Sequence, residues 1–223
     1  MEAMKNRIHR TAPRAAGGLL RRPIVYLAAP VIVAVLGLGV RAAFAMCGRP
    51  PGTTINLVST NGTRVTFRIG STAVNCTLVR ASFTVPPSPN NCETPGSPLF
   101  MALSTPVFTG CSITASGASF PATIAASGTW QIGFSDEGPT ATLVVPRSGL
   151  RITASLLGSA CTTTVAPAGP ATLLGSWSNA TSSATFANQP LPIATSGGFP
   201  CPSSTSATFS GTFTTSPSFI YTL

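Results

Sequence analysis

Very few side chains in this sequence could take part in acid–base or nucleophilic chemistry. The only histidine is His9 and the only lysine is Lys5, both close to the amino terminus. After residue 45 the acidic side chains are Glu93, Asp136 and Glu137. A Ser–His–Asp or Cys–His arrangement needs a histidine, and a Schiff base needs a lysine. We therefore expect the segment after residue 45 to be non-enzymatic.

The three carboxylates are poorly placed for paired acid–base work. Asp136 and Glu137 are adjacent in an expected turn, where neighbouring side chains diverge. A glycosidase needs two carboxyl groups that face each other across a cleft. Glu93 follows Cys92 directly and is expected on the surface. We predict no catalytic residue, no metal site and no cofactor; a cleft that joined Glu93 to Asp136 or Glu137 would instead indicate an enzyme.

Six cysteines lie after residue 45, and their spacing favours disulfides over a metal or redox site. No pair has C-x-x-C spacing, and no histidine is available there as a further ligand. An even number of cysteines is typical of a protein that folds in an oxidising compartment. Six cysteines allow 15 pairings, and we favour pairs that join segments close enough in the chain to be neighbours in an antiparallel sheet. The favoured pairs are Cys47–Cys92, Cys76–Cys111 and Cys161–Cys201.

Aromatic side chains are the remaining candidates for a binding site. Trp130 alternates with Ile132 and Phe134, which is the pattern of the buried face of a strand. Trp177 lies between two serines near an expected strand end, where exposure is more plausible than for Trp130. It is therefore the candidate for ligand binding, with burial in the core as the alternative. The partner considered for it is a glycan or another cell-wall polymer.

The net charge of the chain does not support binding to nucleic acid. The whole sequence has a net charge of +9, but seven of its 13 basic residues lie in the first 45 positions. The remaining segment has six arginines against three acids, which is a net charge of +3. Because the basic cluster belongs to a targeting segment, we expect no nucleic-acid partner.

The first 45 residues have the layout of a signal peptide or membrane anchor. A basic stretch precedes an uncharged apolar run at 24–40, and Ala43-Phe44-Ala45 then offers small residues for cleavage before Met46. The run of 17 residues is a little short of the roughly 20 that span a bilayer as a helix. A cleaved signal peptide and a retained transmembrane helix at 24–40 both stay open, as do the Sec and twin-arginine export routes. Either outcome leaves residues 46–223 secreted or at the extracytoplasmic face of the membrane.

Residues 46–223 have the pattern of one all-β domain. Residues 63–69 alternate strictly, with Val65, Phe67 and Ile69 on one face, and Asn61-Gly62 before them is a typical hairpin turn. No window has the 3.6-residue period of an amphipathic helix. About a dozen short strands therefore favour an antiparallel β-sandwich or a barrel-like domain. The expected strands cover residues 55–59, 63–69, 74–85, 99–103, 107–113, 128–134, 140–145, 150–157, 161–165, 171–177, 183–187 and 207–215.

Three short motifs near the carboxyl terminus carry a resemblance to known proteins. They read ATFANQPL at 184–191, GFPCP at 198–202 and ATFSGTF at 207–213. In this ending the chain resembles uncharacterised secreted β-proteins of actinobacteria, over about the last 45 residues and more loosely from Cys76 to Cys161. The resemblance implies an exported β-domain and no particular activity. We expect a structural or binding role at the cell envelope; the alternative is a module that binds carbohydrate or wall polymer through exposed aromatic side chains.

Overall fold

Strands and turns make up the residues that the computed structural model describes, which are 45–60, 62–93, 97–135 and 140–222. The prediction of an all-β domain is confirmed for these residues, and no helix that could cross a membrane is found among them. By its internal contacts the chain divides into two units, Met1–Arg41 and Ala42–Leu223, and all described residues belong to the second. The expected export or anchor segment, with its apolar run at 24–40, lies outside the described residues.

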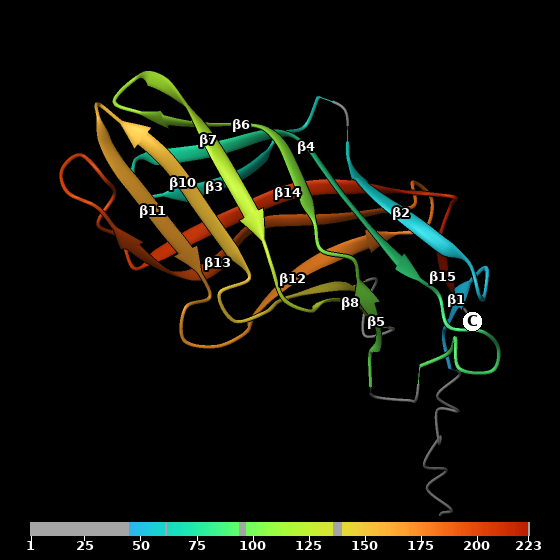
Figure 1. The fold of residues 1–223 in the computed structure, drawn as a ribbon. Helices are drawn as coiled ribbons and strands as arrows, with labels where there is room; N and C mark the ends of the chain where they lie inside the picture. The colour runs from blue at the N-terminus through green and yellow to red at the C-terminus, as the bar shows by residue number, and fades with distance from the viewer. Residues whose placement is uncertain (1–44, 61, 94–96, 136–139, 223) are drawn as a thin grey trace, which may run out of the picture. The chain divides into compact units, whose positions relative to one another are not determined.

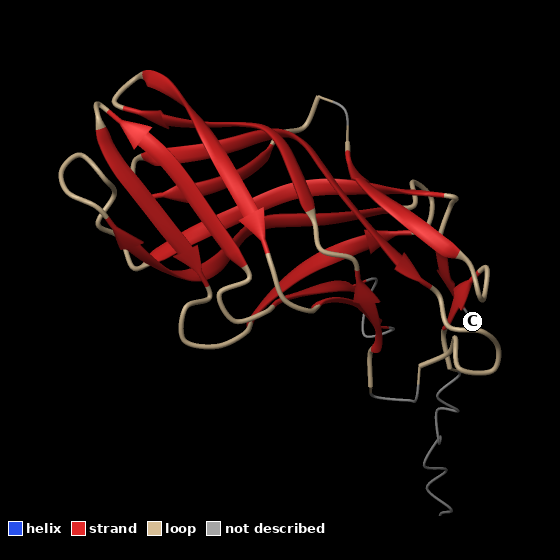
Figure 2. Cartoon of the chain, in the orientation of Figure 1, coloured by secondary structure: helices blue, strands red, loops and turns tan. Residues whose placement is uncertain are grey.

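Fifteen strands follow one another along the described chain (Figures 1 and 2). The twelve expected strands are all present, whereas β1, β7 and β15 were not expected, and β13 is much longer than predicted. The strands are β1 (Cys47–Arg49), β2 (Thr54–Ser59), β3 (Val65–Ile69), β4 (Thr72–Thr84), β5 (Leu99–Leu103), β6 (Val107–Ala115), β7 (Ala118–Ala126), β8 (Trp130–Ser135), β9 (Thr140–Val145), β10 (Leu150–Leu156), β11 (Ser159–Val165), β12 (Ala171–Ser178), β13 (Ser183–Ser196), β14 (Ser206–Ser216) and β15 (Ile220–Thr222).

Thirteen of these strands form one antiparallel sheet whose hydrogen bonding closes on itself. β4, β13 and β14 are long, and five pairs of shorter consecutive strands lie end to end between them: β2/β3, β5/β6, β7/β8, β9/β10 and β11/β12. Each long strand or end-to-end pair bonds to the next one along the chain, and β14 returns to bond with β2 and β3. The arrangement is a closed, barrel-like meander without a break between two separate sheets.

β2 and β3 do not form the hairpin that Asn61-Gly62 predicted. Both strands pair with β4 on one side and with β14 on the other, so they continue each other. The backbone N–H of Thr60 donates to the carbonyl of Thr212 at 2.9 Å and extends the β14 ladder past the end of β2. The hairpin prediction is wrong because it used a local turn signal, whereas the partner strand comes from near the other end of the chain. Asn61 itself lies outside the described residues.

The turns of the closed sheet gather at two ends (Figure 1). We call the end where β3, β6, β10 and β13 finish the pocket end; it is on the left in Figure 1. The other end, the terminal end, carries the small sheet in which Cys47 of β1 pairs with Thr222 of β15. The described chain therefore begins and ends at the end opposite to the pocket end.

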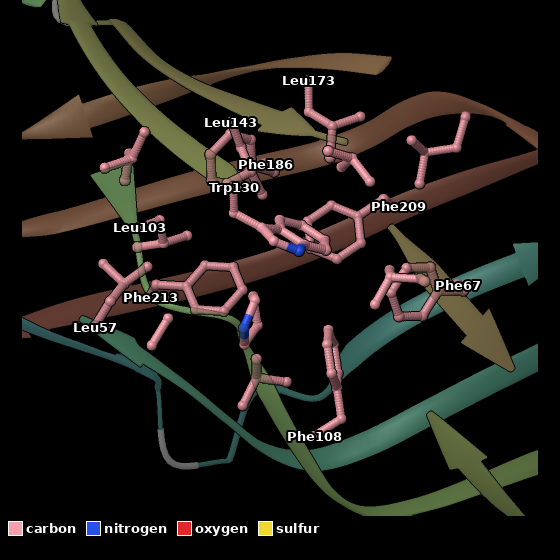
Figure 3. A pocket seen from close by; sticks show the side chains of 17 residues that line it. Leu57, Phe67, Leu103, Phe108, Trp130, Leu143, Leu173, Phe186, Phe209 and Phe213 are labelled. Carbon is pink, nitrogen blue, oxygen red and sulfur yellow. The ribbon is translucent and has the colours of Figure 1, made fainter. Parts of the chain in front are cut away.

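Large side chains fill the interior of the closed sheet. Val65, Phe67 and Ile69 are buried as their alternation predicted, and so is Trp130. Figure 3 shows the rings of Phe67, Phe209 and other aromatic residues from facing walls converging in the middle. The cavity left between them measures about 30 Å³ and is lined by apolar side chains. Such a space is enough for only a few water molecules, so side chains fill most of the interior.

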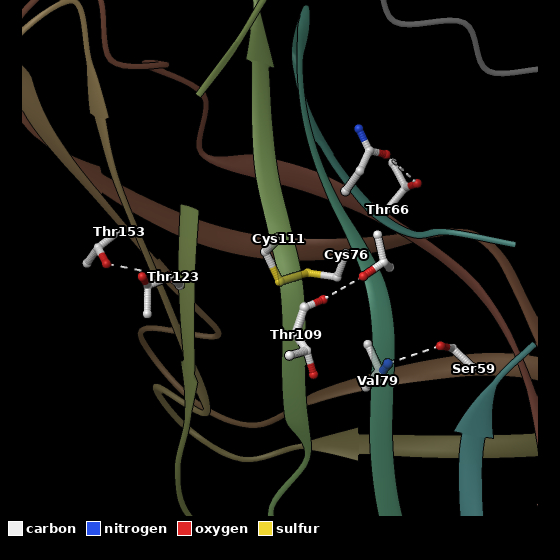
Figure 4. Close-up of a disulfide and its surroundings, with 10 residues drawn as sticks. Ser59, Thr66, Cys76, Val79, Thr109, Cys111, Thr123 and Thr153 are labelled. Atoms are coloured by element: carbon white, nitrogen blue, oxygen red, sulfur yellow. Dashed lines mark hydrogen bonds between the residues drawn. A yellow bond between two sulfur atoms is a disulfide. The ribbon is translucent and has the colours of Figure 1, made fainter. Parts of the chain in front are cut away.

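Three disulfides join parts of this structure, and they are the pairs that the sequence favoured: Cys47–Cys92, Cys76–Cys111 and Cys161–Cys201. Cys76 of β4 and Cys111 of β6 stand directly opposite each other in the ladder, with Cα atoms 4.0 Å apart (Figure 4). The other two bridges tie a loop to a strand, one at each end of the sheet. Three disulfides are typical of a protein that folds in an oxidising, extracytoplasmic compartment.

Candidate functional site

A pocket of about 730 Å³ opens at the pocket end of the closed sheet. All four turns of that end contribute to it: Gly70-Ser71, Ser116, Leu157 and the loop between β13 and β14. Its floor includes Ile69 and Leu156, which are each 1% exposed and belong to the core. These two side chains separate the pocket from the filled interior, so a ligand would bind at the mouth of the sheet and not inside it.

Two exposed apolar side chains stand at the edge of the pocket. Phe199 is 94% exposed and Leu157 is 76% exposed, which makes them the most exposed large hydrophobic residues that the structure describes. Neither side chain contributes to the core. Apolar surface gathered around a concave site is typical of a place where a ligand or partner binds.

Leu157 occupies an unfavourable backbone position. It forms the two-residue turn between β10 and β11 with Gly158, and the φ angles of the two residues are 50° and 86°. Positive φ at both residues is the pattern of type I′ hairpin turns, which prefer asparagine, aspartate or glycine. A leucine with positive φ is a steric outlier. The turn thus holds a bulky apolar side chain in the solvent at a cost of about 1–2 kcal/mol.

The loop between β13 and β14 is fastened to β11. The Cys161–Cys201 disulfide makes the covalent link, and the Ser159 hydroxyl donates to the carbonyl of Phe199 at 3.0 Å. Gly197 has a φ of 135°, and a side chain there would collide with the Ala160 carbonyl at 2.7 Å. These constraints fix the wall of the pocket that carries Phe199.

The polar side chains of the pocket are hydroxyls alone. They come from Ser71, Thr72, Ser116, Ser203 and Ser204, and no charged or amide side chain lies among the lining residues. The Ser204 hydroxyl donates to the Ser206 carbonyl at 2.7 Å, so it already has a partner within the chain. Ser71, Ser116 and Ser203 are solvent-exposed residues, so their hydroxyls are accessible for hydrogen bonding.

Trp177 does not belong to this site, because it is buried, which was the alternative to its role as a candidate binding residue. Its side chain is 3% exposed, and its ring packs 5.0 Å from that of Phe134 and 5.4 Å from that of Phe219. The indole Nε1 donates to Asn179 Oδ1 at 2.7 Å, which satisfies its one polar group. The flanking serines suggested exposure, but in a strand they point to the opposite face from the tryptophan, and Phe219 from the chain end covers the ring.

The prediction that Glu93 lies on the surface is also wrong. The residue is 5% exposed. Its backbone N–H donates to the Met46 carbonyl at 2.9 Å, next to the Cys47–Cys92 disulfide. Pairing with the unexpected segment before β1 therefore buries it at the terminal end, far from the pocket. Asp136 and Glu137 lie outside the described residues.

The sequence analysis missed the pocket. Its signals were weak: the GFPCP motif places an aromatic residue two positions before a cysteine, and Leu157-Gly158 places a leucine before a glycine at the end of an expected strand. Comparison with known protein families found no match, and searches of curated proteins and of solved structures returned none either. The function therefore has to be inferred from the geometry of this end of the sheet.

Proposed function

We propose that residues 46–223 form an exported, non-enzymatic binding domain that acts at the cell envelope. The pocket end is its binding site. The observation that carries this proposal is a pocket of about 730 Å³ with two solvent-exposed apolar side chains at its edge. Small-molecule sites usually measure about 300–1,000 Å³ and combine apolar walls with a few polar groups. The three disulfides support the extracytoplasmic location.

The second candidate function is binding of carbohydrate or wall polymer. The observation that favours it is the ring of Phe199, whose exposure of 94% leaves it free to stack against a sugar ring. Ser116 and Ser203, from two different turns, line the same pocket and offer hydroxyl groups for hydrogen bonding. Trp177 and Trp130 cannot take this role because both are buried.

Filling the pocket is expected to abolish ligand binding. Ala118 is exposed and lines the pocket, so Ala118→Trp would occupy the space that a ligand needs. Ala125→Trp is the matched control, because Ala125 is exposed on the same strand but outside the pocket. Ligand-observed NMR with a library of small uncharged molecules measures the effect. Hits that survive Ala118→Trp, or that Ala125→Trp removes equally, would contradict the assignment of the site.

Export is expected to leave a protein that begins at Met46 or within a few residues of it. The expectation rests on the Ala43-Phe44-Ala45 pattern after the apolar run. N-terminal sequencing of protein from the culture medium measures the cleavage position. Intact chain in the membrane fraction, with its domain digested by protease added to whole cells, would support the anchor instead. Intact chain in the cytosol would contradict both.

A further inference from the structure

The pocket offers nothing that would neutralise a charged ligand. None of its lining residues has an ionisable side chain, since the sulfur of Cys201 is in a disulfide. Burying a charged group without a partner of opposite charge is strongly unfavourable. An anionic or cationic ligand would therefore lose its hydration at this site and gain no ion pair. The lining selects for uncharged ligands.

The hydroxyl groups of the pocket are better suited to hydrogen bonding with a ligand that has a few separate oxygen atoms than with a sugar. A serine hydroxyl makes single hydrogen bonds through one rotating proton and two lone pairs. Asparagine, aspartate and arginine side chains, which can bind two adjacent groups at once, are missing from the lining. A ligand with many neighbouring hydroxyls would leave most of them unsatisfied here, whereas one with a few separate oxygens would not.

Apolar side chains contribute to the pocket lining alongside the hydroxyl groups. Phe120 and the ring carbons of Pro200 and Pro202 line it together with Leu157 and Phe199. Leu157 is 76% exposed, has a positive φ and is not part of the core, so neither backbone geometry nor core packing accounts for a leucine there. Strain of this kind points from the observed outlier to a role in binding.

We infer that the pocket binds an uncharged amphiphile, which is a molecule with an apolar chain or ring system and a few hydroxyl or ester oxygens. Neutral glycerolipids belong to this class. Leu157 and Phe199 contact its apolar part, and the hydroxyls of Ser71, Ser116 and Ser203 contact its oxygens. The inference rests on the proposed function, since it names the ligand class of the same site.

The test uses the exported protein, purified without reducing agent, and three probes. Monodecanoylglycerol, below the concentration at which it forms micelles, represents the inferred class. Decanoate has the same chain with a charge, and maltotetraose is uncharged but has no apolar chain. Isothermal titration calorimetry should show saturable binding of monodecanoylglycerol, binding of decanoate weaker by about tenfold or more, and no binding of maltotetraose.

A substitution at Leu157 separates a binding role from a structural one. Leu157→Asn is expected to weaken monodecanoylglycerol binding by about tenfold and at the same time to raise the melting temperature, because asparagine tolerates a positive φ. Leu174→Asn is the control: Leu174 is 61% exposed on β12 and lies outside the pocket. It should leave binding unchanged.

The possible results separate a wrong ligand class from a wrong binding site. No saturable binding of monodecanoylglycerol, or equal binding of decanoate, would overturn the inference. Binding of maltotetraose that Ala118→Trp abolishes would also overturn it, but would leave the pocket as the binding site and favour carbohydrate. Unchanged monodecanoylglycerol binding in Ala118→Trp would place that binding elsewhere and count against both the inference and the proposed function.

Discussion

Replacing Phe134 with alanine is expected to lower the free energy of unfolding by about 3–5 kcal/mol. Phe134 has no exposed surface. Its ring centroid lies 4.7 Å from that of Phe219, 5.0 Å from that of Trp177 and 6.1 Å from that of Phe83. The substitution would leave a cavity among rings that come from three separate parts of the chain. A loss of this size is a large share of the roughly 5–15 kcal/mol that stabilise a domain.

Denaturant unfolding followed by tryptophan fluorescence measures the loss, and Trp177 reports on the cluster directly. Phe100→Ala is the matched control, because Phe100 is 44% exposed on β5, the strand next to β8. It should cost clearly less than Phe134→Ala. Equal losses of unfolding free energy for the two variants would contradict the tight packing of Phe134 against the rings of Phe83, Trp177 and Phe219.

Replacing both Cys161 and Cys201 with serine is expected to lower the free energy of unfolding by about 4 kcal/mol. The two residues are 40 positions apart, and a bridge stabilises mainly by limiting the unfolded chain. In a domain of this size each kcal/mol lowers the melting temperature by about 2–4 °C. The same substitution frees the loop that carries Phe199, so ligand binding at the pocket end should fall as well.

The Cys47→Ser, Cys92→Ser double variant is the control for this effect. Its bridge spans 45 positions, so it should cost similar stability, but it lies at the terminal end and should leave the pocket unchanged. NMR signals of Leu157 and Ser203 distinguish the two variants. Alkylation of the denatured wild-type protein should label no cysteine, whereas Cys161→Ser alone should expose the thiol of Cys201. Two or more labelled cysteines in the wild type would contradict the disulfide framework.

The length of β13 shows how tertiary context overrides a local rule. The sequence pattern predicted this strand over residues 183–187 only. Pro190 and Pro192 beyond it lack the N–H that a central strand needs. In the structure both prolines lie between the part of β13 that pairs with β12 and the part that pairs with β11. The Pro192 carbonyl accepts from the N–H of Ala166 at 2.8 Å, so the missing N–H of Pro192 faces the end of β11 and leaves the ladder with β14 on the other side of the strand intact.

The sequence by itself determined where twelve of the fifteen described strands lie and which face of β3 and of β8 is buried. Strict alternation predicted the buried sides of β3 and of Trp130 in β8, because side chains in a strand point alternately to opposite faces whatever the partner is. It also favoured the three disulfides, since each pair joins segments that are neighbours along the meander. These properties depend on residues close together in the chain, which a sequence shows directly.

Only the tertiary structure decided how the sheet closes and where its pocket lies. β14 pairs with β2 and β3, more than a hundred residues earlier, and no local pattern specifies that partner. The closure brings four separate turns to one end and so places Leu157 beside Phe199. The same closure turns Trp177 inward, beneath Phe219. Burial depends on which distant segments cover a side chain. That is settled only when the three long strands and the five end-to-end pairs of the sheet are all in place.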